Sequence, residues 1–140
     1  MENSDVFPVD FPGPLHKIIL KRKAIMIIKH LDEIPKEIPK MEGIKDVTLQ
    51  WLFNRRDGTK NYAMRVFELK PGGIIPLHDH DNMEHEIFIL EGEASATTPD
   101  RIIKVRTNDA LFIRPGETHG FANDSNQPFK FLCVIPVVEK

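Results

Sequence analysis

The amino-acid sequence predicts an all-β fold, built as a single sandwich or jelly-roll β-barrel. Roughly nine or ten short stretches carry the β-branched and aromatic residues typical of strands, and turn residues separate them every ~8–12 positions. No stretch carries a convincing helical period. The chain has 140 residues, which is enough for one buried core but short for two. A jelly-roll barrel closes its sheet edges around an interior cavity, which suits functional side chains that point inward.

Residues 1–25 are expected to form an extended arm ahead of a folded domain at residues 26–140. Three prolines and a glycine lie within residues 1–14, with Phe7 and Phe11 between them, and no helical or alternating pattern follows. The two phenylalanines are placed to dock either on the domain or on a neighbouring subunit, which favours a homodimer. Whether the arm is integral to the fold or an appendage is left open by the sequence.

The first half of the domain alternates strands with proline and glycine turns. Residues 25–31 are predicted to form the first strand, which ends before an acidic turn. Two prolines exclude a helix from residues 34–40. Residues 47–53 and 62–69 are predicted strands, and the second is expected to end at Pro71-Gly72-Gly73.

The second half is predicted to contain closely spaced strands joined by tight turns. A short apolar approach at residues 74–77 leads into a cluster of histidines. Glycine, proline, Asn and Asp mark the turns between the segments that follow. We expect strands at residues 84–91, 94–98, 101–107, 110–114, 119–123 and 129–138.

Charge and composition exclude several classes of protein. The formal net charge is −2, with 19 Lys+Arg against 21 Asp+Glu, so no basic footprint for nucleic acid is present. The single cysteine, Cys133, excludes an intrachain disulfide and lies in an apolar run, which favours a buried, inert thiol and a cytoplasmic protein. Apolar runs of about five residues are far too short to span a membrane. We expect a soluble protein without a signal peptide.

Three histidines, His78, His80 and His85, fall within eight residues. Side chains alternate between the two faces of a strand, so His78 and His80 point to the same side while Asp79 points to the other. This H-x-H pair, followed by a third histidine on the next strand, predicts a shared metal site rather than isolated structural histidines.

The next strand can face inward with either of two sets of side chains. One set is His85, Ile87 and Ile89, which carries no formal charge, and the other begins with Glu84 and Glu86. We favour the first because the second would place two acids in the barrel interior. A register shift of one residue would make Glu84 or Glu86 the ligand instead.

A fourth histidine, His119, follows the turn at Pro115-Gly116 and starts a short strand. Four histidine side chains are therefore predicted to converge on one divalent metal ion. The alternation leaves open whether Arg65 or Arg114 points inward. Trp51 or Phe67 is expected nearby. The predicted pocket lining is apolar and consists of Ile87, Ile89, Phe112, Phe121 and Cys133.

Residues 72–92 and 109–123 resemble the two sequence motifs of the cupin superfamily. In the first motif Gly72, His78, His80 and Gly92 fit, and His85 occupies the place of the usual glutamate. In the second motif Pro115, His119 and Asn123 fit, while Asp109 replaces a glycine and the gap from proline to histidine is one residue shorter. These departures are similar to a subgroup of small single-domain cupins that bind manganese through four histidines. The resemblance covers most of residues 45–136.

The resemblance implies a function as well as a fold. It implies a divalent metal, Mn2+ first and Fe2+, Zn2+, Ni2+ or Cu2+ as alternatives, because imidazole suits all of these ions. Four neutral ligands leave the full charge on the ion, which strengthens it as a Lewis acid. The implied activity is a metal-dependent, dioxygenase-like oxidoreductase that acts on a small, partly apolar molecule through water or O2 on the metal. The alternatives are a non-catalytic metal- or ligand-binding cupin and a Lewis-acid isomerase or lyase. Small cupins also commonly form homodimers.

Overall fold

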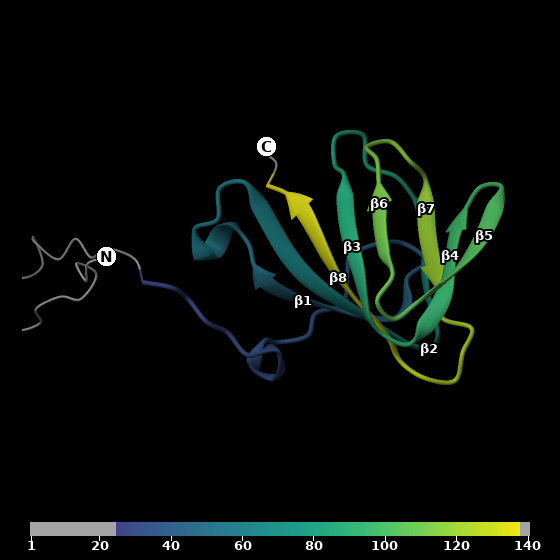
Figure 1. Cartoon of the computed structure of the whole chain (residues 1–140), viewed down its shortest axis with the longest axis horizontal. Helices are drawn as coiled ribbons and strands as arrows, with labels where there is room; N and C mark the ends of the chain where they lie inside the picture. Colours follow the sequence, from purple (N-terminus) through teal and green to yellow (C-terminus); the bar gives the residue numbers. More distant parts are fainter. Residues whose placement is uncertain (1–24, 138–140) are drawn as a thin grey trace, which may run out of the picture.

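The computed structural model describes residues 25–137, and their regular structure is almost entirely β-strand (Figure 1). The predicted all-β class is confirmed. Seven of the predicted strands appear at nearly their expected bounds, and none of the described helices is long and apolar enough to cross a membrane. The elements are η1 Leu31–Glu33, β1 Lys45–Phe53, η2 Arg55–Asp57, β2 Tyr62–His78, β3 His85–Glu91, β4 Glu93–Thr98, β5 Arg101–Arg106, β6 Ala110–Ile113, β7 His119–Ala122 and β8 Phe129–Pro136.

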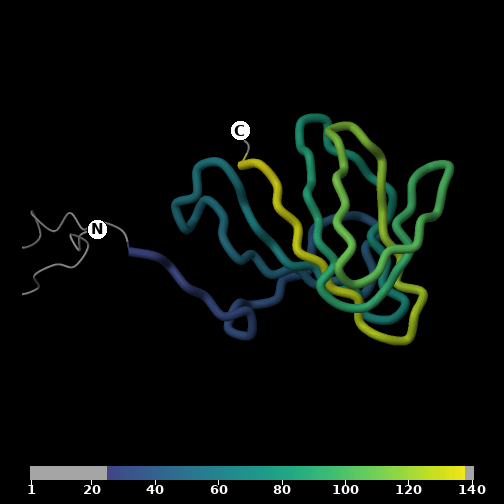
Figure 2. The backbone as a smooth tube through the Cα atoms, in the orientation of Figure 1, coloured from purple at the N-terminus to yellow at the C-terminus, as the bar shows by residue number. Residues whose placement is uncertain are grey.

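The strands form one curled antiparallel sheet organised around β2. Its strand order is β5-β4-β7-β2-β8-β3-β6, and β1 pairs with β2 beside that path. The first part of β2 pairs with β1 and β8, and its last part pairs with β7. Figures 1 and 2 show β2 as a long element that runs from its partners β1 and β8 toward β7. Because β2 ends at His78, this strand carries the first histidine from the core to one end of the barrel.

The predicted turn at Pro71-Gly72-Gly73 was wrong, because β2, which has 17 residues in all, continues through these positions to His78. Gly72 has a φ of +87°, a backbone conformation that glycine adopts readily. A Cβ on Gly73 would lie 2.8 Å from the Asp46 carbonyl oxygen, so the chains pack closely there. The Gly72 amide donates to the Asn123 carbonyl, and the Asn123 amide donates to the Gly73 carbonyl. The glycines therefore mark a change of pairing partner rather than the end of the strand.

The predicted first strand at residues 25–31 is also wrong. Residues 25–30 form no regular structure, and Ile25, Met26, Ile27 and Ile28 are all exposed. A strand needs a pairing partner, and none of the described segments pairs with this one. The chain is anchored just beyond it, where the buried Gln50 side chain donates to the carbonyls of Leu31 and Ile34. Residues 1–24 of the predicted arm, with Phe7 and Phe11, lie outside the described residues.

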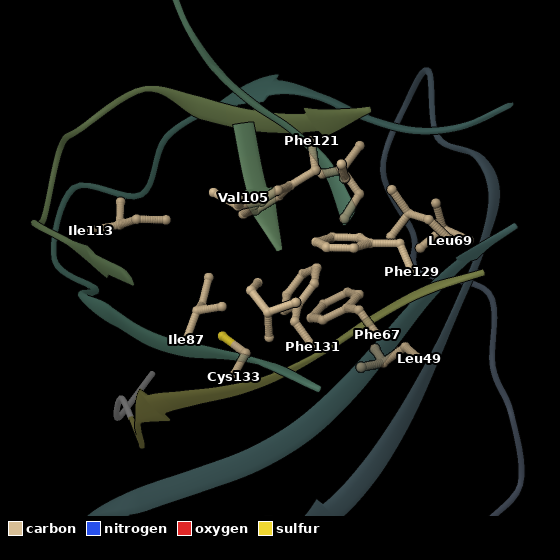
Figure 3. Packing of buried hydrophobic residues seen from close by; sticks show 14 of the residues in the cluster. Leu49, Phe67, Leu69, Ile87, Val105, Ile113, Phe121, Phe129, Phe131 and Cys133 are labelled. Carbon is tan, nitrogen blue, oxygen red and sulfur yellow. The ribbon is translucent and has the colours of Figure 1, made fainter. Parts of the chain in front are cut away.

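The interior of the curled sheet is filled with aromatic and aliphatic side chains (Figure 3). Along β8 every second residue is buried, so Phe129, Phe131, Cys133 and Ile135 all point inward. The Phe131 ring centroid lies 5.1 Å from that of Phe67 and 4.9 Å from that of Phe121. These contacts close one part of the interior, and the remaining part is the cavity described next.

Candidate functional site

The fold brings together all four histidines that the sequence singled out. His78 ends β2 and pairs in register with His119, the first residue of β7. His85 is the first residue of β3, and His80 lies in the turn between β2 and β3. The ring centroids of His78 and His119 are 4.4 Å apart, and those of His85 and His119 are 5.1 Å apart. His80 completes the cluster, with its centroid 5.1 Å from that of His78 and 5.4 Å from that of His85.

Backbone carbonyls orient two of the four rings. The Nδ1 atom of His78 lies 2.8 Å from the Pro76 oxygen, and that of His119 lies 2.8 Å from the Glu117 oxygen. A carbonyl can only accept, so each ring donates its Nδ1–H and keeps the lone pair on Nε2. This is the arrangement by which a ligating histidine is commonly held, with the second nitrogen bonded to the protein.

His85 is the most deeply placed member of the cluster, with a relative exposure of 3%. Its Nδ1 atom lies 3.4 Å from the thiol sulfur of Cys133, while its Nε2 atom is buried without any hydrogen-bond partner. Buried polar atoms are nearly always satisfied, so this unpartnered nitrogen needs a reason. Burial, followed by the neighbouring His119 and Arg65, lowers the pKa of His85 from 6.5 to about 3.

The other inner histidines are also held neutral. Burial is the main cause that lowers the pKa of His119 and the pKa of His80. Burial likewise raises the pKa of the Cys133 thiol, which agrees with the expectation of an inert buried cysteine. At neutral pH His80, His85 and His119 are therefore uncharged, the form in which imidazole binds metal ions.

A cavity of about 230 Å³ opens beside the histidines. Three of the five predicted pocket residues line it, namely Ile87, Phe121 and Cys133. Ile89 is fully buried in the core instead, with a relative exposure of 0%. Phe112 differs from the expectation more strongly, because it lies on the outer face of β6 and is half exposed. Its neighbour Ile113 is buried, so the alternation of β6 turns Phe112 away from the interior.

The burial pattern of β3 answers the question of register. His85, Ile87 and Ile89 are buried, and Glu86 on the opposite face is exposed. This is the register that the sequence favoured, because it keeps charge out of the interior.

Comparisons with known proteins place the chain in a family. The family described as "Cupin domain" matches residues 65–135, which is half of the chain. The chain belongs to the cupin family. The cupin fold expected from the motifs is confirmed. These matches do not distinguish the four-histidine manganese subgroup from other cupins.

Several known proteins are similar to this cupin. An oxalate-binding protein from Thermotoga maritima is 28% identical over 120 residues, which are 83% of this chain and 98% of that protein. The structure of a polyketide cyclase from Streptomyces resistomycificus matches with a TM-score of 0.78 and 35% identity, covering 81% of each chain. A predicted oxalate decarboxylase from Thermotoga maritima matches with a TM-score of 0.71 and 27% identity, covering 80% of this chain and all of the other.

The donor set of this cupin fits a metal ion by its chemistry. Metal–nitrogen distances of ~2.0–2.1 Å place the rings around one ion a few ångströms apart, and the observed ring separations of 4.4–6.5 Å are of that order. Among residues 25–137, no group of three or more His, Cys, Asp or Glu side chains meets the geometry of a formed metal site. The metal therefore stays a prediction that rests on the donors and their surroundings.

Sequence reasoning missed two features of the cavity. The first is Arg65, whose orientation was left open and which the structure places in the lining. It shares its strand face with Ala63, Phe67 and Leu69, all buried, so closer attention to parity within β2 would have placed it inward. Arg114, the other candidate, is exposed and stacks on Phe112 outside.

The second missed feature is the irregular segment at residues 39–44. Pro39, Lys40, Met41 and Ile44 line the cavity, and both Met41 and Ile44 pack against the core. Nothing periodic in this proline-rich stretch indicated the contact, since irregular segments carry no repeating pattern.

Proposed function

We propose that this cupin binds one divalent metal ion through His78, His80, His85 and His119. The observation that supports this most is the buried Nε2 atom of His85, which has no partner although the His85 ring lies within 5.1–5.4 Å of the His119 and His80 rings. Leaving such an atom unsatisfied costs about 1–3 kcal/mol, and a bound cation would remove that cost. The oriented rings of His78 and His119 support the same proposal.

Mn2+ is the proposed ion, following the resemblance to the four-histidine subgroup, with Fe2+, Zn2+, Ni2+ and Cu2+ as alternatives. Imidazole ligands do not discriminate strongly among these ions. No carboxylate among the described residues lines the cavity to offset the charge of the ion. When bound, the ion would supply a strong Lewis acid that polarises an oxygen of the substrate.

We propose a Lewis-acid reaction on a small, partly apolar molecule that carries a carbonyl or carboxylate oxygen. Ile87, Phe121 and Phe131 give the cavity apolar walls that hold the body of such a molecule and exclude water. The volume of about 230 Å³ suits a small molecule, since pockets for drug-sized ligands run from about 300 Å³. The similarity to proteins named polyketide cyclase and oxalate-binding protein supports oxygen-rich ligands of this kind.

A dioxygenase-like oxidation is the second candidate, and the resemblance of the motifs supports it. On a six-coordinate ion, the four histidines would leave two positions open, which would suit O2 as well as a substrate. Simple binding without turnover is a third candidate, which the printed name of the oxalate-binding relative supports.

Metal analysis tests the binding proposal. Inductively coupled plasma mass spectrometry of the untagged chain should find about one ion per chain, and His85→Ala and His78→Gln should lose it. His30→Ala is the matched control, because His30 is exposed and lies outside the cluster. Circular dichroism should show that the variants keep the β-fold. A wild-type chain that takes up no ion after reconstitution with each of the five metals contradicts the proposal.

Oxygen consumption separates the reaction classes. The metal-loaded chain is incubated with a panel of small carbonyl and phenolic compounds in an oxygen electrode, with product formation followed by mass spectrometry. Conversion without O2 uptake supports the Lewis-acid reaction, and conversion with stoichiometric uptake supports the oxidoreductase. Saturable binding with no conversion of any compound leaves the binding role.

We also propose that the chain forms a homodimer. The exposed apolar run at residues 25–28 supports this, because large exposed apolar patches commonly mark interaction sites. Light scattering should give twice the chain mass for the full chain and the single mass for a chain that starts at Lys29, which lacks this apolar run. A single mass for the full chain contradicts the proposal.

A further inference from the structure

Arg65 lies in the lining of the cavity without a carboxylate to neutralise it. It belongs to β2, opposite Cys133 of β8 in the sheet register. Its Nε atom is buried and has no hydrogen-bond partner, and its Nη2 atom lies 3.8 Å from the Cys133 sulfur. Within residues 25–137 it forms no ion pair. A buried Nε atom without a partner is costly, and an anion bound to the guanidinium would offset that cost.

Aromatic rings hold this guanidinium in place. The Arg65 Cζ atom lies 4.9 Å from the centroid of Phe67 and 5.3 Å from that of Trp51. Cation–π contacts of this kind orient the guanidinium but leave its N–H groups free to donate. Arg65 is therefore an ordered donor, rather than a flexible surface cation that happens to point inward.

The cavity around Arg65 carries an excess of positive and neutral donors. Its described lining contains four histidines, Arg65 and Lys40, and no Asp or Glu. Two acids close in sequence to the histidines are engaged elsewhere, because Asp79 accepts from Thr118 and Glu117 accepts from the Arg114 amide. A cavity with this charge balance attracts an anion.

We propose that Arg65 is the anion-binding residue of the cavity, and that the substrate is a small carboxylate with an apolar body. The guanidinium fork matches the two oxygens of a carboxylate, and one fork alone suits a carboxylate better than a phosphate. The apolar walls Ile87, Phe121 and Phe131 take the rest of the molecule. The inference deepens the proposed function and rests on it only for the role of the cavity, because Arg65 binds the anion with or without a metal.

Calorimetric titration with benzoate and with its neutral analogue benzamide tests the proposal. The full chain is titrated both metal-free and loaded with Mn2+. Benzoate should bind at least about tenfold more tightly than benzamide in both forms. In the metal-free chain, where no bound ion attracts the carboxylate, Arg65→Gln should abolish that preference, and Arg65→Lys should keep part of it, since the charge remains but the fork is lost. Arg114→Gln is the matched control, because this exposed arginine also stacks on a phenylalanine but lies outside the cavity.

The benzoate-to-benzamide ratio is informative because a merely structural Arg65 would lower both affinities together. Thermal unfolding of Arg65→Gln and Arg65→Lys checks that both variants are folded. If Arg65→Gln does not fold, the comparison uses Arg65→Lys alone. Equal binding of the two probes to the wild type, no benzoate binding, an unchanged preference in Arg65→Gln, or tighter binding of inorganic phosphate than of benzoate overturns the proposal. A preference that depends on Arg65 in a chain that takes up no metal upholds this inference while the metal proposal fails.

Discussion

Two parts of the barrel interior are built from the same strands but differ in whether their buried atoms all have partners. The packed part contains Leu69, Ile89 and Phe129, each with no exposed surface. The histidine part contains the four imidazoles and Arg65, with two buried nitrogen atoms that no hydrogen bond satisfies. Strand β8 passes through both, since Phe129 lies in the packed part and Cys133 touches His85.

The difference shows where stability and function reside in this small domain. Apolar burial at the packed part favours folding at about 25 cal/mol per Å². The histidine part is destabilising by itself, because the His85 Nε2 atom and the Arg65 Nε atom are buried without partners. Unsatisfied buried polar atoms of this kind are typical of binding sites, where a ligand supplies the missing partner.

The largest expected effect is at the packed part. Phe129→Ala should lower the free energy of unfolding by about 3–5 kcal/mol, because it removes a fully buried ring that packs against Phe121 and Phe131. Urea unfolding of the metal-free chain measures the change. The exposed Phe112→Ala is the control, and it should cost far less. Equal losses in the two variants would remove the distinction between the packed interior and the surface.

A polar residue of the packed part provides the next test. Asn123 is 1% exposed, and its amide nitrogen donates to the carbonyls of Leu69 and Gln127. Asn123→Ala should therefore cost about 1–3 kcal/mol in urea unfolding, since it removes both hydrogen bonds, of which the one to Leu69 is buried. Ser125→Ala should have a smaller effect, because its hydroxyl is partly exposed. A neutral Asn123→Ala would show that water replaces the amide.

The histidine part should respond in the opposite direction. His85→Leu in the metal-free chain should leave the free energy of unfolding unchanged or raise it by up to about 1 kcal/mol, because it removes an unsatisfied buried nitrogen. The same variant should lose the metal. Urea unfolding with chelator present measures the first effect. A loss above about 2 kcal/mol would mean that His85 supports the fold directly, as a core residue does.

Acid should weaken the metal-free fold through the same histidine. The folded-state pKa of His85 is lowered by burial from 6.5 to about 3, so the unfolded chain binds more protons between these two values. The free energy of unfolding should therefore fall as the pH decreases from 6.5 toward 3. The lowered pKa values of His80 and His119 act in the same direction. Unfolding curves at several pH values should be flatter for His85→Leu than for the wild type, and parallel curves would contradict the assignment.

Much of this architecture could be predicted from the residues alone. Period-two alternation placed His85 and Ile87 on the inner face of β3, and turn residues such as Gly92 separated the strands at nearly the observed bounds. The spacing of His78, His80, His85 and His119 also predicted one shared cluster. These features depend on neighbours in the sequence, which is why a local pattern can specify them.

The tertiary structure decided what depends on distant partners. The glycines at 72 and 73 end no strand because β7 pairs with the continuation of β2, and residues 25–31 form none because no described segment pairs with them. The parity of β2 turns Arg65 inward, but only the tertiary structure places Cys133 of β8 and the Trp51 ring beside it. Phe112 faces outward because its neighbour Ile113 occupies the inner face of β6. Pairing and enclosure are set by residues far away along the chain, and a local pattern contains no information about which of them will meet.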